Sequence, residues 1–284
     1  MKQKTIKSAI TSKGIGLHSG KEVTLSFLPA PVNHGVVFQR TDMPNQPFVP
    51  AIGELVHDTM MSSNLTKDGA SVGTVEHLLS AIAGLEIDNL IVQVSAAEMP
   101  IMDGSAAEFV KLLLKAGIEE QTTNKKYLRI KKLVRVEEAD KWAQFTPLDG
   151  YELHFEIDFN HPAINKTGQK ASLVMTPENY INQLSQARTF GFLKDIELLK
   201  QNNLALGGNL DNAIVLTDDE IMNKEGLRFD DEFVRHKILD AVGDLFLIGY
   251  PLKAKFEAYK SGHGLNNKLV RAVLADPDNY EIIE

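Results

Sequence analysis

A histidine and an aspartate four residues apart, His236 and Asp240, constrain the fold of this chain more than any other feature. Apolar residues recur at helical spacing around them, which predicts a helix from about Glu232 to Ile248. On a helix, this spacing places both side chains on one face, where they can hold a single metal ion. Asp244 continues the same polar line one turn further on. A complete metal site needs another ligand, so the fold must bring a distant segment against this helix.

The candidate for that distant ligand is His77, which directly follows Glu76. Thr74 predicts a capped helix start, and we expect a helix from Val75 to Ala83 with Gly84 at its far end. Pairing this helix with the one around His236 and Asp240 gives two imidazoles and one carboxylate. Such a set leaves a coordination position open for water.

Glu76 is expected to act on that water and not to bind the ion, because neighbours on a helix point about 100° apart. As a general base it would accept a proton while the water attacks a carbonyl carbon. Two alternatives stay open. His236 and Asp240 are also compatible with a solvated helix face, and Glu76 with an exposed first-turn glutamate that the helix dipole favours.

Hydrolysis of an amide also requires a proton for the departing nitrogen, and His263 is the candidate donor. It lies between two glycines, where backbone can approach a ligand closely. A nearby Asp244 would raise the pKa of His263 and keep it protonated. The alternative is a loop or capping histidine without a chemical role.

The order of predicted elements in the second half of the chain repeats that of the first half. In each half, strands precede a long helix, a further strand and a last helix, expected at 106–116 and at 267–275. Aligning residue 77 with residue 236, a shift of 159, also places Gly104 and Ser105 beside His263 and Gly264. We therefore predict an α+β protein of two similar domains that arose by internal duplication.

The polar, unpatterned segment 121–126 marks the boundary, which gives an N-terminal domain at 1–122 and a C-terminal domain at 127–284. Each domain has one insertion, at about 56–72 and at about 188–218, and insertions commonly carry binding surfaces. The second insertion is rich in apolar residues around Phe190 and Phe192. It can form a channel for an apolar ligand or, as the alternative, ordinary core.

Composition excludes several classes of protein. The chain has no cysteine, so thiolate ligands and disulfides are excluded, and its net charge of -8 argues against a nucleic-acid partner. The start, Met1–Ile6, has positive charge but no following apolar run, so we expect no signal peptide. No uncharged apolar run reaches about 18 residues, so no transmembrane segment is expected. We expect a monomer in the cytoplasm.

Five longer motifs, Val75–Ala81, Met102–Ser105, Ala187–Phe192, Phe233–Asp244 and Lys260–Asn267, occur in this order along the chain. Together they closely resemble the UDP-3-O-acyl-N-acetylglucosamine deacetylases, the zinc amidases of lipid A synthesis. The resemblance covers nearly the whole chain. It implies two α+β domains whose helices are sandwiched between two outer β-sheets, which agrees with the predicted duplication.

The resemblance also implies roles for individual residues. It implies one zinc ion, or alternatively ferrous iron, on His77, His236 and Asp240, with Glu76 as general base. His263 would be the general acid or an electrostatic partner supported by Asp244, and Thr189 would help to hold the oxyanion. The residues implied to bind substrate are Met61, Phe159, Phe190, Phe192, Ile196, Ala205, Ala213, Lys237 and Lys260. Within this set, Phe190, Phe192, Ile196, Ala205 and Ala213 would line the acyl passage.

The implied activity is zinc-dependent hydrolysis of the N-acetyl group of UDP-3-O-(3-hydroxyacyl)-N-acetylglucosamine to a free 2-amine and acetate. Two other functions remain open. The chain can be a metal-dependent amidohydrolase for another acylated amino sugar, or a non-catalytic protein that binds a nucleotide sugar. The presence of both Glu76 and His263 argues against the second of these.

Overall fold

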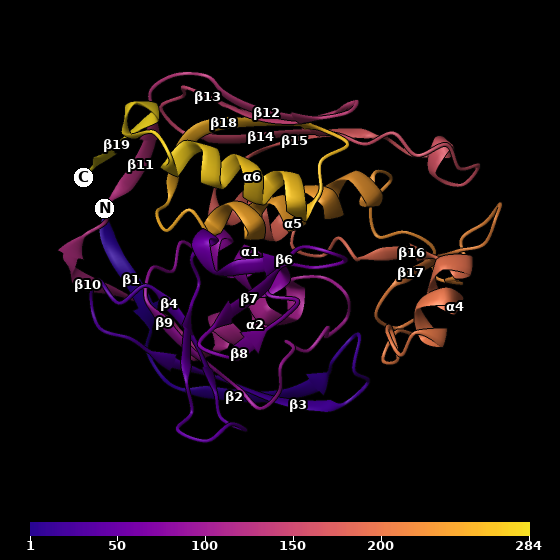
Figure 1. Ribbon diagram of the computed structural model, residues 1–284, viewed down its shortest axis with the longest axis horizontal. Coiled ribbons are helices and arrows are strands. Elements are labelled where there is room, and N and C mark those ends of the chain that lie inside the picture. The colour runs from indigo at the N-terminus through magenta and orange to yellow at the C-terminus, as the bar shows by residue number, and fades with distance from the viewer.

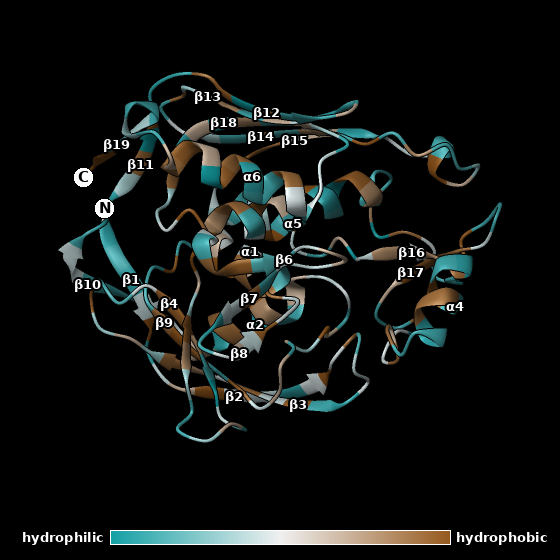
Figure 2. Cartoon of the chain, viewed as in Figure 1, coloured by the Kyte–Doolittle hydropathy of each residue, from teal (hydrophilic) through white to brown (hydrophobic).

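Two β-sheets form the outer layers of the molecule and helices lie between them (Figure 1). The computed structural model describes all 284 residues and confirms the predicted α+β class. From one face to the other, the layers are a five-stranded sheet, the helices α1 and α2, the helices α5 and α6, and a seven-stranded sheet. Figure 2 shows hydrophobic residues along the central helices α1 and α5.

The first half of the chain forms the five-stranded sheet, with the order β2-β3-β9-β4-β5. In β3, every second residue is buried, so Val23, Leu25 and Phe27 point into the core. The elements are β1 (Lys2–Ile6), β2 (Ile10–Ile15), β3 (Glu22–Pro29), β4 (Val36–Arg40), β5 (Phe48–Pro50), the 3-10 helix η1 (Gly53–Leu55), β6 (Val56–Asp58), β7 (Asn64–Lys67), β8 (Ala70–Val72), α1 (Glu76–Gly84), β9 (Leu90–Val94), α2 (Ala107–Ala116) and β10 (Ile118–Asn124). β6, β7 and β8 form a separate three-stranded sheet at the position of the predicted first insertion.

The second half forms the seven-stranded sheet, in which β18 pairs with β11, β13 and β14. The elements are β11 (Tyr127–Ile130), β12 (Val134–Glu138), β13 (Lys141–Thr146), β14 (Tyr151–Glu156), η2 (Ile164–Lys166), β15 (Lys170–Val174), α3 (Pro177–Gln183), β16 (Phe190–Phe192), α4 (Leu193–Gln201), β17 (Ile214–Leu216), α5 (Glu232–Phe246), β18 (Leu252–Tyr259), α6 (His263–Leu274), η3 (Pro277–Asn279) and β19 (Tyr280–Ile283). β16 and β17 pair only with each other and, with α4, lie to one side of the layers (Figure 1). None of the helices combines the length and the apolar character that crossing a lipid bilayer requires.

The central helices α1 and α5 cross at very close range. A side chain at Gly243 of α5 would overlap with the backbone carbonyl of Glu76 at the start of α1. Gly84, at the other end of α1, leaves room in the same way for the ring of Tyr180. The buried Tyr180 hydroxyl is 2.9 Å from the Ser80 hydroxyl of α1, which joins this helix to the second half. Two glycines thus set the position of the helix that begins with Glu76 and His77.

Three local predictions were wrong. Thr74 does not cap α1, because its backbone is left-handed (φ 54°) and its hydroxyl makes no hydrogen bond; Val75 is the N-cap residue. Most of segment 121–126 is regular, because β10 continues to Asn124 and pairs with β1. The last helix, α6, begins at His263 and not at residue 267. The proposed domain boundaries and the internal duplication stay predictions.

Candidate active site and metal centre

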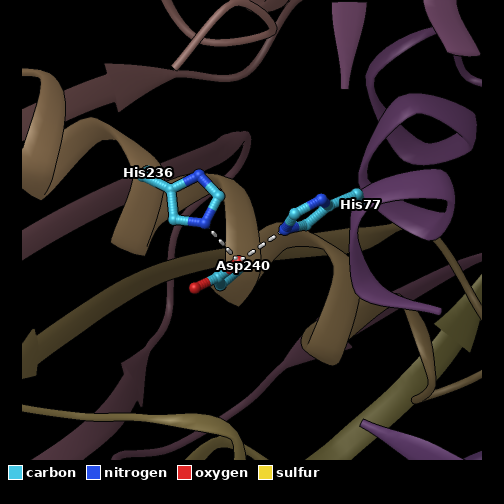
Figure 3. Close-up of side chains that lie close together, drawn as sticks. All are labelled: His77, His236 and Asp240. Carbon is cyan, nitrogen blue, oxygen red and sulfur yellow. Dashed lines mark ion pairs between the residues drawn. The ribbon is translucent and has the colours of Figure 1, made fainter. Parts of the chain in front are cut away.

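His77, His236 and Asp240 form a buried group that can hold a metal ion. His77 is the second residue of α1, whereas the other two lie one turn apart on α5. Each of the three is at most 4% exposed, so the solvated-face alternative does not hold. Asp240 Oδ1 is 3.2 Å from His236 Nε2 and 3.5 Å from His77 Nε2. Figure 3 shows both imidazole rings directed at Asp240 from different helices.

These distances fit a tetrahedral metal ion. Nitrogen and oxygen ligands about 2.0–2.2 Å from zinc lie roughly 3.3–3.6 Å apart when the angle between them is tetrahedral. The two histidine-to-aspartate distances, 3.2 and 3.5 Å, are close to that range, and all three ligand atoms lie within 4.8 Å of one another. Three protein ligands leave a fourth position for water or substrate, as in catalytic zinc sites.

The charge states of the group also suit a cation. Burial would raise the pKa of the Asp240 carboxyl, but His236 and Lys237 hold it well below its usual range. Lys237 Nζ lies 2.6 Å from Asp240 Oδ2, which leaves Oδ1 to face the two imidazoles. Burial lowers the pKa of His77, so its ring is neutral as a metal ligand must be.

Glu76 lies beside this group and is buried. It is 3% exposed, and burial raises its pKa to about 7. One carboxylate oxygen, Oε2, accepts a hydrogen bond from the Ser63 backbone N–H at 3.0 Å. The other oxygen, Oε1, is 4.0 Å from His263 Nε2. Since the carboxylate is buried, the alternative of an exposed first-turn glutamate does not hold.

His263 and Asp244 form a buried pair on the other side of Glu76. His263 Nδ1 is 2.9 Å from Asp244 Oδ2, so Nε2 is the ring nitrogen directed at Glu76. Burial would lower the pKa of His263, but the adjacent Asp244 carboxylate raises it to about 9. Asp244 also accepts hydrogen bonds from the Ser63 hydroxyl at 2.6 Å and the Asn266 side chain at 2.8 Å. The imidazole is therefore held as a cation with its free nitrogen facing the carboxylate of Glu76.

A cavity of about 570 Å³ lies against the metal group and is lined by both halves of the chain. Its apolar wall begins at Phe190, whose ring centroid is 6.4 Å from that of His236 and 5.6 Å from that of Phe159. It continues along α4, none of whose residues is fully buried, so α4 is not ordinary core, whereas Ile214 and Leu216 of β17 belong to the hydrophobic core. Of the residues implied by the resemblance, the cavity is lined by Met61, Phe159, Thr189, Phe190, Phe192, Ile196, Ala205, Ala213 and Lys237.

Lys260 is the one implied substrate residue that the structure does not bring to the cavity. Its Nζ is 2.6 Å from Asp140 and 3.5 Å from Asp158, on an exposed part of the second half. Its neighbour Ser261 leads to His263 through Gly262, so Lys260 lies near the site without lining it.

A family model described as UDP-3-O-acyl N-acetylglycosamine deacetylase matches residues 3–275. A UDP-3-O-acyl-N-acetylglucosamine deacetylase of Psychrobacter cryohalolentis is 61% identical over 283 residues, covering 100% of this chain and 88% of the relative. Proteins of the same name from Mannheimia succiniciproducens and Haemophilus influenzae are 54% and 55% identical over 284 residues, covering 100% of this chain and 93% of each relative. The chain belongs to this deacetylase family. The predicted family and enzyme class are therefore confirmed.

Sequence reasoning missed two residues that organise the site of this family member. Ser63 binds both Glu76 and Asp244, one through its backbone and one through its hydroxyl. It lies in the predicted first insertion, in which the resemblance implies a role only for Met61. Asn266 lies inside the motif Lys260–Asn267 and could have been found there, because it is a polar residue in the first turn of a helix that begins with a candidate acid.

The first prediction concerns the ligands. His236→Ala should reduce the bound metal from about one ion per chain to nearly none, because two ligands rarely retain a catalytic ion. Metal per chain is measured by elemental analysis after dialysis against metal-free buffer. The control is His154→Ala, which removes a partly exposed histidine whose ion-pair partner is Glu152, away from the metal group. Full occupancy in the His236 variant would show that the ion is bound elsewhere.

Proposed function

We propose that the chain hydrolyses the N-acetyl group of UDP-3-O-(3-hydroxyacyl)-N-acetylglucosamine, releasing acetate and a free 2-amine, in lipid A biosynthesis. One observation carries the proposal: a metal-binding group, a buried carboxylate and an apolar passage share a single cavity. The relatives' names support the same reaction. The monomeric state stays a prediction. The cytoplasmic location stays a prediction.

We propose zinc as the resident ion, held by His77, His236 and Asp240. Two imidazoles and one carboxylate form a usual catalytic zinc set, and ferrous iron is the other ion that such a set binds. When bound, the ion polarises the acetyl carbonyl and makes a water molecule easier to deprotonate. Elemental analysis of protein purified with and without oxygen separates the two metals, because ferrous iron is lost on oxidation.

Glu76 and His263 divide the proton transfers in the proposed reaction. Glu76, with a pKa raised by burial to about 7, accepts the proton of the attacking water. The carbonyl carbon becomes tetrahedral, and the negative charge that develops on the former carbonyl oxygen would lie near Thr189, which lines the cavity. His263 then gives its Nε2 proton to the departing nitrogen as the amide C–N bond breaks, with its charge stabilised by Asp244.

The apolar wall of the second insertion would hold the 3-O-acyl chain. Each methylene buried there contributes about 0.8 kcal/mol, so ten would contribute several kcal/mol even after the cost of ordering the chain. Lys237 lines the cavity beside Asp240 and would contact the sugar. Phe159 and Lys260 would contact the UDP end.

The activity itself is tested by release of acetate from UDP-3-O-(3-hydroxyacyl)-N-acetylglucosamine and from UDP-N-acetylglucosamine, which lacks the acyl chain. The acylated substrate should be strongly preferred, and Glu76→Gln should keep its metal while losing about two to four powers of ten in kcat. Equal rates on both substrates would favour a generic amidohydrolase. Tight binding without turnover would favour a nucleotide-sugar binder.

The pH profile tests the role of His263. Its pKa is raised to about 9 by Asp244, so the protonated acid should be lost, and kcat/KM should fall, as the pH rises past that value. Asp244→Asn removes the negative charge that raises this pKa, and the basic limb should move to lower pH by about 1–3 units. His263→Gln is the control and should abolish the limb. A basic limb that stays in place in both variants would assign it to another ionisation.

A bulky substitution tests the acyl passage. Ala213 suits this better than Ala205, because Ala205 has a left-handed backbone (φ 53°) that a large side chain would strain further. Ala213→Phe should lower kcat/KM for long acyl chains by roughly tenfold to hundredfold and for short chains much less. The control, Leu198→Phe, adds an aromatic ring to an exposed position of α4 that does not line the cavity. Similar losses for long and short chains would contradict the passage.

A further inference from the structure

Four buried side-chain polar atoms in the chain have no hydrogen-bond partner, and two of them lie at the start of α1. These two are Thr74 Oγ1 and His77 Nδ1, three residues apart, and both residues line the cavity of the site. The other two belong to His18 and Tyr151. A buried donor or acceptor without a partner is costly, so two at one place require an explanation.

The ring of His77 shows which atom is missing a partner. Its Nε2 faces Asp240, so Nδ1 is directed away from the metal group (Figure 3). An imidazole that binds a metal through Nε2 carries its proton on Nδ1, and that N–H normally donates to a second group that fixes the ring. The other candidate ligand has such a group, because His236 Nδ1 is 3.0 Å from the Ala187 carbonyl oxygen. His77 has none.

The backbone holds Thr74 where it cannot serve α1 as a cap. A left-handed conformation, here φ 54°, is rare for a β-branched residue and persists only when its surroundings impose it. Gly73 N–H donates to the Ala97 carbonyl at 2.8 Å, and Met99 N–H donates to the Gly73 carbonyl at 2.9 Å. These bonds fix the chain just before Thr74 and leave its hydroxyl buried at the site, 4% of the residue being exposed.

We propose that Thr74 is a positioning residue for the metal ligand His77. In the metal-loaded protein, Thr74 Oγ1 accepts a hydrogen bond from His77 Nδ1–H, directly or through one water molecule. This bond selects the tautomer with Nε2 free for the ion and fixes the ring plane. It gives both unpaired atoms a hydrogen-bond partner. The two ligand histidines then each have a hydrogen bond at Nδ1. The inference rests on the proposed role of His77 as a ligand.

Thr74→Val is the decisive variant, because valine keeps the shape and the β-branching and replaces the hydroxyl by a methyl group. Zinc affinity, measured by competition with a chromogenic chelator, should fall about tenfold to hundredfold. Thr74→Ser should restore most of it. The nitrogen-15 spectrum of the imidazoles should show a slowly exchanging His77 Nδ1 proton in the zinc-loaded wild type and in Thr74→Ser, and fast exchange in Thr74→Val.

The matched control is Thr5→Val, which removes another buried hydroxyl. Thr5 Oγ1 donates to the Asn89 carbonyl at 2.7 Å and accepts from Ala30 N–H at 3.1 Å. This variant should unfold at lower temperature with unchanged zinc affinity, whereas the metal-free Thr74→Val protein should unfold no earlier than wild type. Wild-type zinc affinity in Thr74→Val, or equal weakening in Thr74→Ser, would overturn the inference. His77→Ala separates the two proposals: if it still binds zinc at the site, the ligand assignment itself fails.

Discussion

The close crossing of α1 and α5 is the contact on which the rest of the site depends. At Gly243 the two helices meet with no side chain between them, against the carbonyl of Glu76. This brings His77 to within 3.5 Å of Asp240 although the two are far apart in the sequence. Ser63 then joins the two halves a second time, since it binds Glu76 of one and Asp244 of the other.

Burial and neighbouring charges shift the pKa values of the two proton-transfer groups to different extents. For Glu76, desolvation dominates and raises the pKa to about 7, so the carboxylate becomes a stronger base. For His263, desolvation would lower the pKa, but the negative charge of Asp244 raises it by more, so the pKa is about 9. Between these two values, a basic carboxylate and an acidic imidazolium exist together 4.0 Å apart. Hydrolysis of an amide needs one group that accepts a proton and another that donates one. The surroundings of Glu76 and His263 give them these two roles. A bound cation would lower the pKa of Glu76 from this raised value.

Much of this arrangement could be read from the sequence, because helical spacing is a local property. The interval of four between His236 and Asp240 and the alternation in β3 and β9 depend only on neighbouring residues. What could not be read depends on tertiary contacts. Thr74 was expected to cap α1, but a left-handed backbone imposed by Gly73, Ala97 and Met99 leaves no signal in the sequence. The role of Ser63 was missed for the same reason, since one of its two bonds comes from its backbone. The polar residues of β10 gave no strand pattern because none of them is fully buried.

The site and the passage differ in how firmly the fold holds them. The metal ligands lie on α1 and α5, which pack against each other between the two sheets. Part of the wall of the proposed acyl passage lies on α4, which has no fully buried residue. Segments with few buried apolar contacts open at lower free energy than the core. Differences in acyl-chain length would therefore be accommodated along α4, while His77, His236 and Asp240 lie on helices of the central layers.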